Sequence, residues 1–127
     1  MPGFDDLVLN GQPAVAYDGV RSMATEGRQW LARLEVLDGD GLPIDFTGCT
    51  ALCQVWERST LVTTIPVNLT TGQVELTKEA ADTVGLAAGV RGGRRCAWGL
   101  VLTKGTVSAQ IWGPDNSFLT IHNATGV

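Results

Sequence analysis

The chain has 127 residues, of which 44% are hydrophobic and 17% are charged, and its formal net charge is −4. This balance is too apolar for a disordered chain and fits one globular domain, which buries roughly two thirds of its surface on folding. The negative charge argues against a sequence-independent grip on nucleic acid, which favours a basic surface.

The chain offers no signal for a membrane or a secretory route. No apolar stretch is long enough to cross a bilayer, and the opening MPGFDDLVLN has acids where a signal peptide has lysines or arginines. We therefore expect a protein that is neither membrane-bound nor secreted by that route. The three cysteines, Cys49, Cys53 and Cys96, are odd in number and form no disulfide framework.

Residues 1–27 differ from the rest because they hold several glycines and prolines and only short extended stretches. We interpret them as an extended N-terminal arm, followed by a β-sandwich domain over residues 28–127. Such an arm is suited to laying a strand along the exposed sheet edge of a neighbour. Its apolar candidates for partner binding are Phe4, Leu7, Val8 and Leu9.

The pattern becomes regular from residue 29 onward, where Trp30, Ala32, Leu34 and Val36 follow the two-residue period of a half-buried strand. Further strands are expected at 49–58, 60–67, 73–77, 95–103, 106–112 and 117–122, after the first at 29–37. Several short strands at this spacing predict an all-β, antiparallel β-sandwich. The single helical candidate spans residues 78–84, with Thr77 as its cap.

The strand at 95–103 has an inward face of Cys96, Trp98, Leu100 and Leu102. Trp56 and Trp112 fall out of phase with the inward positions of their own strands, so we expect both to face outward. Large exposed aromatic side chains often mark an interface. A β-bulge at either residue would instead turn its side chain inward.

Catalytic and metal sites lack the residues that they need. His122 is the only histidine, and no acid, base and nucleophile group with it in the sequence. Cys49 and Cys53 share one face of a strand, but no second pair of ligands follows them. We therefore expect neither enzymatic activity, nor a metal, nor a cofactor.

Two further features leave alternatives open. Cys53 and Cys96 lie on inward faces of separate strands, so a sandwich could bring them opposite each other as a disulfide, although free buried thiols suit a reducing cytoplasm better. Arg91, Arg94 and Arg95 form the one basic cluster, which could contact nucleic acid or an acidic partner surface. The cluster has no interleaved aromatic residues, so nucleic acid is the weaker reading.

The order of an early Trp, a D-G-x-G turn and the run P-x-D-F-T-G-C-x-A is familiar. It resembles the immunoglobulin-like β-sandwich of bacteriophage tail and baseplate adaptor proteins, including the N-terminal domain of upper baseplate proteins and a long-tail-fibre connector domain. The similarity covers roughly residues 28 to 122, and within this range it includes the segment 72–77. The matching positions are Trp30, Asp38, Gly39, Gly41, Pro43, Asp45, Phe46, Thr47, Gly48 and Ala51.

The resemblance implies a non-enzymatic virion structural protein that is assembled in the cytoplasm of a bacterial host. It would attach to other virion proteins as a tail or baseplate adaptor, or as a capsid decoration protein on the major capsid protein. We expect several copies to follow the symmetry of the virion. The alternative is a carbohydrate- or cell-surface-binding module, which would need aromatic residues that converge in an exposed groove.

Overall fold

The computed structural model describes residues 7–13, 17, 19–86, 93–113 and 117–122. Its elements in chain order are β1 (Val8–Leu9), β2 (Gln12–Pro13), β3 (Arg21–Thr25), β4 (Trp30–Glu35), β5 (Cys49–Glu57), β6 (Thr60–Ile65), β7 (Val67–Thr70), β8 (Gln73–Lys78), α1 (Ala80–Thr83), β9 (Arg94–Lys104), β10 (Val107–Trp112) and β11 (Phe118–His122). Strands dominate and the one described helix has four residues. No described helix is therefore long and apolar enough to cross a membrane.

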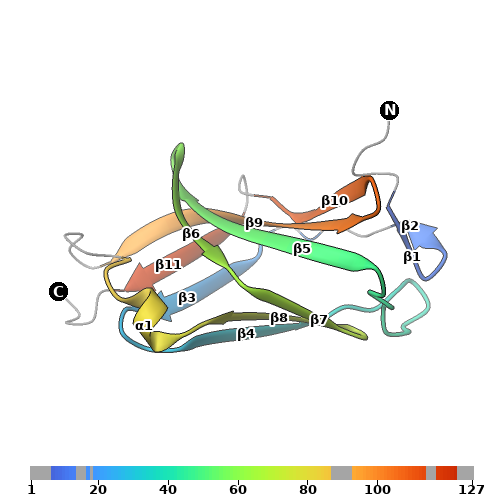
Figure 1. Ribbon diagram of the computed structural model, residues 1–127, viewed down its shortest axis with the longest axis horizontal. Coiled ribbons are helices and arrows are strands. Elements are labelled where there is room, and N and C mark those ends of the chain that lie inside the picture. The colour runs from blue at the N-terminus through green and yellow to red at the C-terminus, as the bar shows by residue number, and fades with distance from the viewer. Residues whose placement is uncertain (1–6, 14–16, 18, 87–92, 114–116, 123–127) are drawn as a thin grey trace.

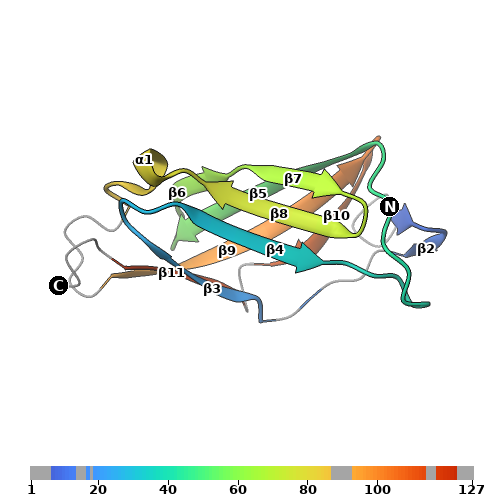
Figure 2. The same ribbon diagram turned by 90° about the horizontal axis from the view of Figure 1, so that it is seen from below.

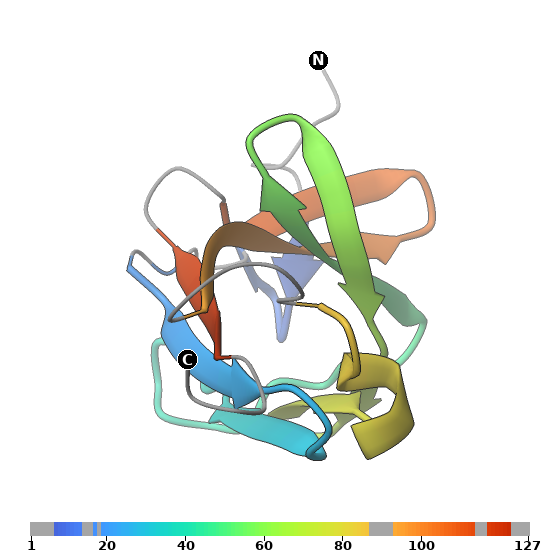
Figure 3. The same cartoon turned by 90° about the vertical axis from the view of Figure 1, so that its left-hand side faces the viewer.

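Apart from the two-stranded hairpin of β1 and β2, the strands form two sheets that face each other (Figures 1 and 3). The large sheet has the order β3-β11-β9-β5-β6, with β10 also paired to β9, and the small sheet has the order β4-β8-β7. In chain order these strands alternate between the sheets as strands B to G do in an immunoglobulin-like domain. The expected all-β sandwich is confirmed. Every pair is antiparallel except β3 with β11, which is parallel.

The last strand of the large sheet is divided in two. β10 pairs with the Leu100–Lys104 half of β9, and β11 pairs with the Arg94–Ala97 half. Both therefore lie along the same edge of β9, on either side of residues 113–117. The backbone N–H of Trp98 donates to the carbonyl oxygen of Ser117 (3.3 Å) across this interruption.

The core lies between the sheets and follows the expected alternation. Cys96, Trp98, Leu100 and Leu102 are all buried on β9. Trp98 packs edge-on against Trp30 of the small sheet, with ring centroids 5.8 Å apart. In Figure 2 the small sheet is seen crossing in front of β9, so this aromatic pair bridges the two layers.

The boundary of the expected N-terminal arm is corrected. Residues 21–25 form β3, an edge strand of the large sheet that pairs along its whole length with β11. Leu7 and Leu9 are buried in the common core. Composition misled here because a two-residue hairpin and a polar edge strand carry little apolar periodicity.

The hairpin of β1 and β2 is also tied to the loop that carries the resemblance. The Asn10 side-chain amide donates to Asp38 Oδ2 (3.0 Å) and to the carbonyl oxygen of Pro43 (2.9 Å). The Asn10 side-chain oxygen accepts from the backbone N–H of Asp45 (2.9 Å). Gln12 accepts from the backbone N–H of Gly39 (2.9 Å). The hairpin of β1 and β2 therefore fixes this loop through side-chain hydrogen bonds.

Two local expectations differ from the structure. The helix spans Ala80–Thr83 and begins after Glu79, which makes no side-chain cap, whereas Thr77 belongs to β8. The strand expected at 60–67 ends at Ile65, and β7 begins at Val67 in the small sheet. Pro66 separates the two strands because it has no N–H to donate to a ladder.

The buried N-terminal residues make a first prediction. Leu9 is 4% exposed and its neighbour Val8 is 49% exposed. Leu9→Ala should lower the free energy of unfolding by about 2–3 kcal/mol, since a buried leucine is truncated. Val8→Ala should change it by less than about 0.5 kcal/mol. Urea unfolding measures both variants, and equal small effects would mean that this segment behaves as a free arm.

The loop carboxylates make a second prediction. The Asn10 amide lowers the pKa of Asp38, with help from the backbone N–H of Leu42. Contacts from Thr47 lower the pKa of Asp45. A depressed pKa stabilises the fold above the unfolded value of about 4, and this contribution is lost as the pH falls through the lowered folded value.

Asp38→Asn should therefore be less stable than the wild-type chain at pH 7 and should lose less stability on acidification below about pH 4. The measurement is urea unfolding across an acid pH series. Glu79→Gln is the control, because Glu79 is exposed and makes no side-chain hydrogen bond among the described residues. Parallel curves for Asp38→Asn and the wild-type chain would contradict the role given to this carboxylate.

Candidate functional site

Some of the residues expected to bind partners are buried in the core of the chain itself. Leu7 and Leu9 are buried in the chain's own core, whereas Val8 is exposed. Phe4 and Arg91 lie outside the described residues. Of the N-terminal candidates that the structure describes, only Val8 has an exposed apolar side chain.

Trp112 faces inward, through the β-bulge that the sequence left open as the alternative to an outward position. A bulge in the pairing of β10 with β9, between Gln110 and Trp112, lets Ile111 and Trp112 both point into the core. Trp112 is 1% exposed and its ring centroid lies 5.1 Å from that of Trp98. Its indole N–H has no hydrogen-bond partner among the described residues. Trp112 is a core residue.

Trp56 is half-buried and lies on the outer face of the large sheet. Strand register places it beside Ala97 of β9, and Ala97 lies in turn beside Phe118 of β11. Neighbouring strands are about 4.8 Å apart, so Trp56 and Phe118 stand roughly 10 Å from each other with the small Ala97 between them. The row continues to Leu61 on the other side of Trp56.

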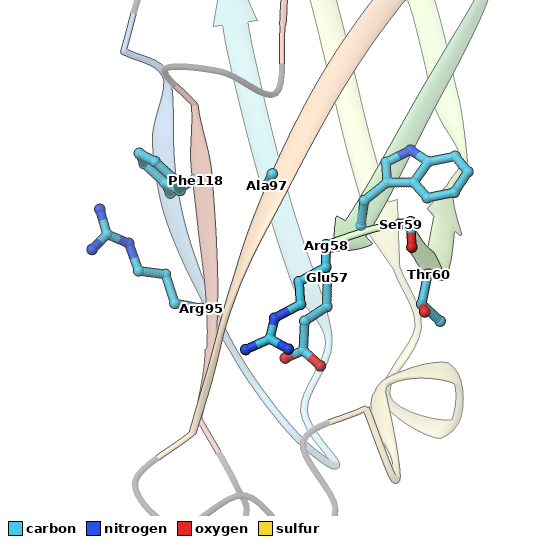
Figure 4. Close-up of a pocket in the computed structure, with 8 residues that line it drawn as sticks. Glu57, Arg58, Ser59, Thr60, Arg95, Ala97 and Phe118 are labelled. Carbon is cyan, nitrogen blue, oxygen red and sulfur yellow. The ribbon is translucent and has the colours of Figure 1, made fainter.

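This row forms a groove of about 920 Å³, which we call the outer groove (Figure 4). Its walls are β11 on one side and the hairpin of β5 and β6 on the other. Figure 4 shows Arg95 and Phe118 across Ala97 from Glu57, Arg58, Ser59 and Thr60. Its lining residues are Trp56, Glu57, Arg58, Ser59, Thr60, Arg95, Ala97 and Phe118.

Charged side chains surround the aromatic ones. The guanidinium carbon of Arg95 lies 4.1 Å from the ring centroid of Phe118, a cation–π contact. Arg94 Nε lies 3.2 Å from Glu57 Oε2, which neutralises the carboxylate in the groove. Arg58 has a positive φ of 57° at the hairpin turn. Of the three arginines expected to contact partners, Arg95 therefore lines the groove, and Arg94 contacts it only through Glu57.

A second, smaller groove adjoins the first and shares Arg95 and Phe118 with it. It has a volume of about 510 Å³ and lies over β3 and β11. Its other lining residues are Arg21, Ser22, Met23 and Thr120. Met23 is 68% exposed, so apolar surface continues across the outer face to the sheet edge.

Sequence reasoning missed Phe118 and Arg58 as members of this surface. Phe118 was detectable, because Leu119 and Ile121 are the apolar alternates of β11 and Phe118 is out of phase with them. Arg58 was not, since its place depends on the geometry of the turn between β5 and β6. Arg21 was hidden because its strand was assigned to the arm.

The described side chains that could hold a metal ion or act in catalysis do not form a cluster. No three His, Cys, Asp or Glu side chains among the described residues lie close enough to hold a metal ion. His122 is exposed at the end of β11. Within the described part of the chain, the outer groove contains no histidine or cysteine. Its chemistry is that of recognition by charge, aromatic surface and hydroxyl groups.

The three cysteines are free thiols. Cys53 and Cys96 lie on neighbouring strands of the same sheet and not opposite each other across the sandwich, because Cys53 pairs with Leu100. Four residues along β9 amount to roughly 13 Å, too far for a disulfide. Burial raises the pKa of Cys53 to about 12. Burial also raises the pKa of Cys49 and Cys96.

Comparisons with known proteins add little to this description. No protein-family model matches the chain, and no curated protein matches it. Among solved structures it is similar to the filamin domain of Lin-41, with 14% identity over 79% of this chain and 82% of that chain and a TM-score of 0.40. A likeness at this level carries no functional argument, and the sandwich assignment rests on the strand pairing itself.

The thiols make a third prediction. Cys49 is half-buried, whereas Cys53 and Cys96 are fully buried. Because only the thiolate reacts, a thiol reagent at neutral pH should modify Cys49 slowly in the native protein and the other two only on unfolding. Ellman's reagent gives the count. Cys49→Ser should abolish the native reaction, and fewer than three thiols in the unfolded, unreduced chain would contradict the free-thiol assignment.

Proposed function

We propose that the chain is a non-enzymatic structural protein of a tailed bacteriophage virion, a β-sandwich that attaches to another virion protein by the outer face of its large sheet. The outer groove carries this proposal. Trp56 and Phe118 flank Ala97 on a face that no described element covers, and Leu61 and Met23, exposed by 44% and 68%, extend the apolar surface on either side. Aromatic anchors surrounded by arginine are typical of protein interfaces.

The virion setting rests on the resemblance of residues 28 to 122 to phage tail and baseplate adaptor domains. A tail or baseplate adaptor and a capsid decoration protein use the same physical principle, since both bind a repeated protein surface. Many copies on a symmetric particle add modest individual contacts through avidity. In this role the chain would be made in the host cytoplasm and function in the virion, with no membrane partner.

A carbohydrate-binding module is the second candidate, favoured by the combination of Trp56, Ser59 and Thr60 in one groove. Sugar rings stack on open aromatic faces, and sugar hydroxyl groups form hydrogen bonds with hydroxyl side chains such as those of Ser59 and Thr60. Arg95 already lies over the ring of Phe118, however. Among the described residues, Trp56 is therefore the one aromatic residue of the outer groove whose ring has no stacking contact. A glycan array separates this candidate from the first.

The fourth prediction tests attachment. Purified protein should cosediment with either the heads or the tails separated from virions of the phage that encodes it. Trp56→Ala should weaken this binding by about 2 kcal/mol or more, since aromatic anchors dominate interface energies. Leu31→Ala is the matched control, because Leu31 is 46% exposed on the small sheet. Mass spectrometry that finds no trace of the chain in purified virions would overturn the proposal.

A further inference from the structure

Positive charge is concentrated around the outer groove in a protein that is acidic as a whole. The formal net charge is −4, from nine Lys and Arg and 13 Asp and Glu residues. Arg58 and Arg95 line the outer groove, Arg21 lines the adjoining one, and Arg94 contacts Glu57. Among the described residues, three of the nine basic residues therefore line the two grooves, against the single carboxylate of Glu57. Such segregation attracts a partner of opposite charge.

Most of this positive charge has no ion pair among the described residues. Glu57 is engaged by Arg94 at 3.2 Å. Arg21, Arg58 and Arg95 have no carboxylate oxygen within 4.0 Å among the described residues. In contrast, Arg33 on the small sheet has Glu75 at 2.9 Å. The outer face of the large sheet thus presents three guanidinium groups that an external anion can bind.

The stacking of Arg95 on Phe118 favours recognition of a carboxylate. A guanidinium group over a ring face uses its flat surface for that contact, and the N–H donors at its rim remain available in a fork that matches a carboxylate. The contact at 4.1 Å also restricts the long side chain. Less conformational entropy is therefore lost when the anion binds.

The floor of the groove adds an apolar requirement. Ala97 and Gly99 are successive outward residues of β9, beside Trp56 and Gln54 of β5. Their small size leaves room above the sheet for an inserted side chain. Trp56 and Phe118 form the two sides of that space. A segment that suits the groove has carboxylates on either side of an apolar residue.

We infer that the outer groove binds an acidic, extended segment of a partner protein, whose carboxylates contact Arg58 and Arg95 and whose apolar side chain lies on Ala97. This rests on the proposed attachment to another virion protein and names the chemistry of that partner. Acidic residues two positions before and two positions after an apolar residue provide both features, because side chains at i, i+2 and i+4 of an extended strand point to the same side.

Nucleic acid fits the same surface less well. Single strands bind by stacking successive bases on open aromatic faces along a basic channel. One face of Phe118 is covered by Arg95, which leaves Trp56 as the main platform. The rest of this acidic chain would repel a polyphosphate backbone. A carboxylate segment needs two arginine contacts and one apolar space, all of which the groove provides.

The experiment is an NMR titration of the full chain with a blocked decapeptide of the repeat Asp-Ser-Leu-Ser, in which the Asp and Leu side chains share one face of the extended peptide. The control peptide has Asn in place of Asp. We expect shifts of the Trp56 indole and the Ala97 amide with the acidic peptide only, and weaker binding at higher salt, because exposed charges are screened. Arg95→Glu and Arg58→Glu should each weaken binding at least about tenfold, since an attraction becomes a repulsion.

Arg28→Glu is the matched control, because Arg28 is exposed and lines neither groove. Arg58→Asn is a second variant that removes the charge and tolerates the positive φ at this position. Urea unfolding checks that each variant is folded. Equal weakening by Arg28→Glu and Arg95→Glu, equal binding of the Asn peptide, or tighter binding of an oligo-dT or oligogalacturonate probe would each overturn the inference.

Particle binding separates this inference from the function on which it rests. If the wild-type chain cosediments with heads or tails and Arg95→Glu does so equally well, attachment stands and the acidic segment is wrong. If the wild-type chain binds neither particle yet binds the acidic peptide with the expected variant pattern, the groove chemistry stands and the virion role fails.

Discussion

The packing of Trp98 against Trp30 and Trp112 is the contact on which the rest of the structure depends. Trp98 lies on β9, where it meets Trp30 across the sandwich and Trp112 beside it in the same sheet. Its indole N–H donates to the carbonyl oxygen of Val20 (2.9 Å). Trp30 donates in the same way to the Ser22 hydroxyl (3.2 Å). Immunoglobulin domains often join their sheets here by a disulfide. In this chain aromatic packing joins them.

The two indole hydrogen bonds fix the N-terminal segment to the rest of the domain at Val20 and Ser22. Val20 also donates its backbone N–H to the Ser117 hydroxyl (3.2 Å), and its carbonyl oxygen accepts from Phe118 (3.0 Å). The segment is thus fixed at the point where β10 gives way to β11. A segment held in this way is not free to leave the domain and add a strand to the sheet of a neighbour. The proposed attachment therefore uses surfaces outside the core, and the outer groove is the larger of the two described grooves.

Much of the fold could be predicted from alternation, and the failures have physical causes. The strands β4, β5, β8, β9, β10 and β11 each lie within two residues of their expected ranges because one buried face imposes a period of two. Strand β3 was missed because Arg21, Ser22 and Thr25 obscure its single buried residue, Ala24. Trp112 was misplaced because a bulge shifts the phase of the pattern, and the sequence did not reveal which tryptophan would be affected.

The outer groove could be predicted only in part for a related reason. Alternation tells which residues of one strand share a face, so Arg95 and Ala97 could be grouped on the outside of β9. It does not tell which outward residues of different strands stand side by side. The row of Trp56, Ala97 and Phe118 needs the register of three strands, and the charge of Arg58 needs the turn that follows β5.

Strand β9 shows how the core and the groove are combined. Its inward residues fill the centre of the sandwich, whereas its outward residues include Ala97 and Gly99, both poor strand formers. A glycine inside a strand costs roughly 0.5–1 kcal/mol relative to alanine. Burial of Trp98 and Leu100 on the opposite side offsets that cost. Small residues at the middle of a central strand do not serve stability. Their short side chains leave the space between Trp56 and Phe118 open, and this is the space that the proposed partner segment would fill.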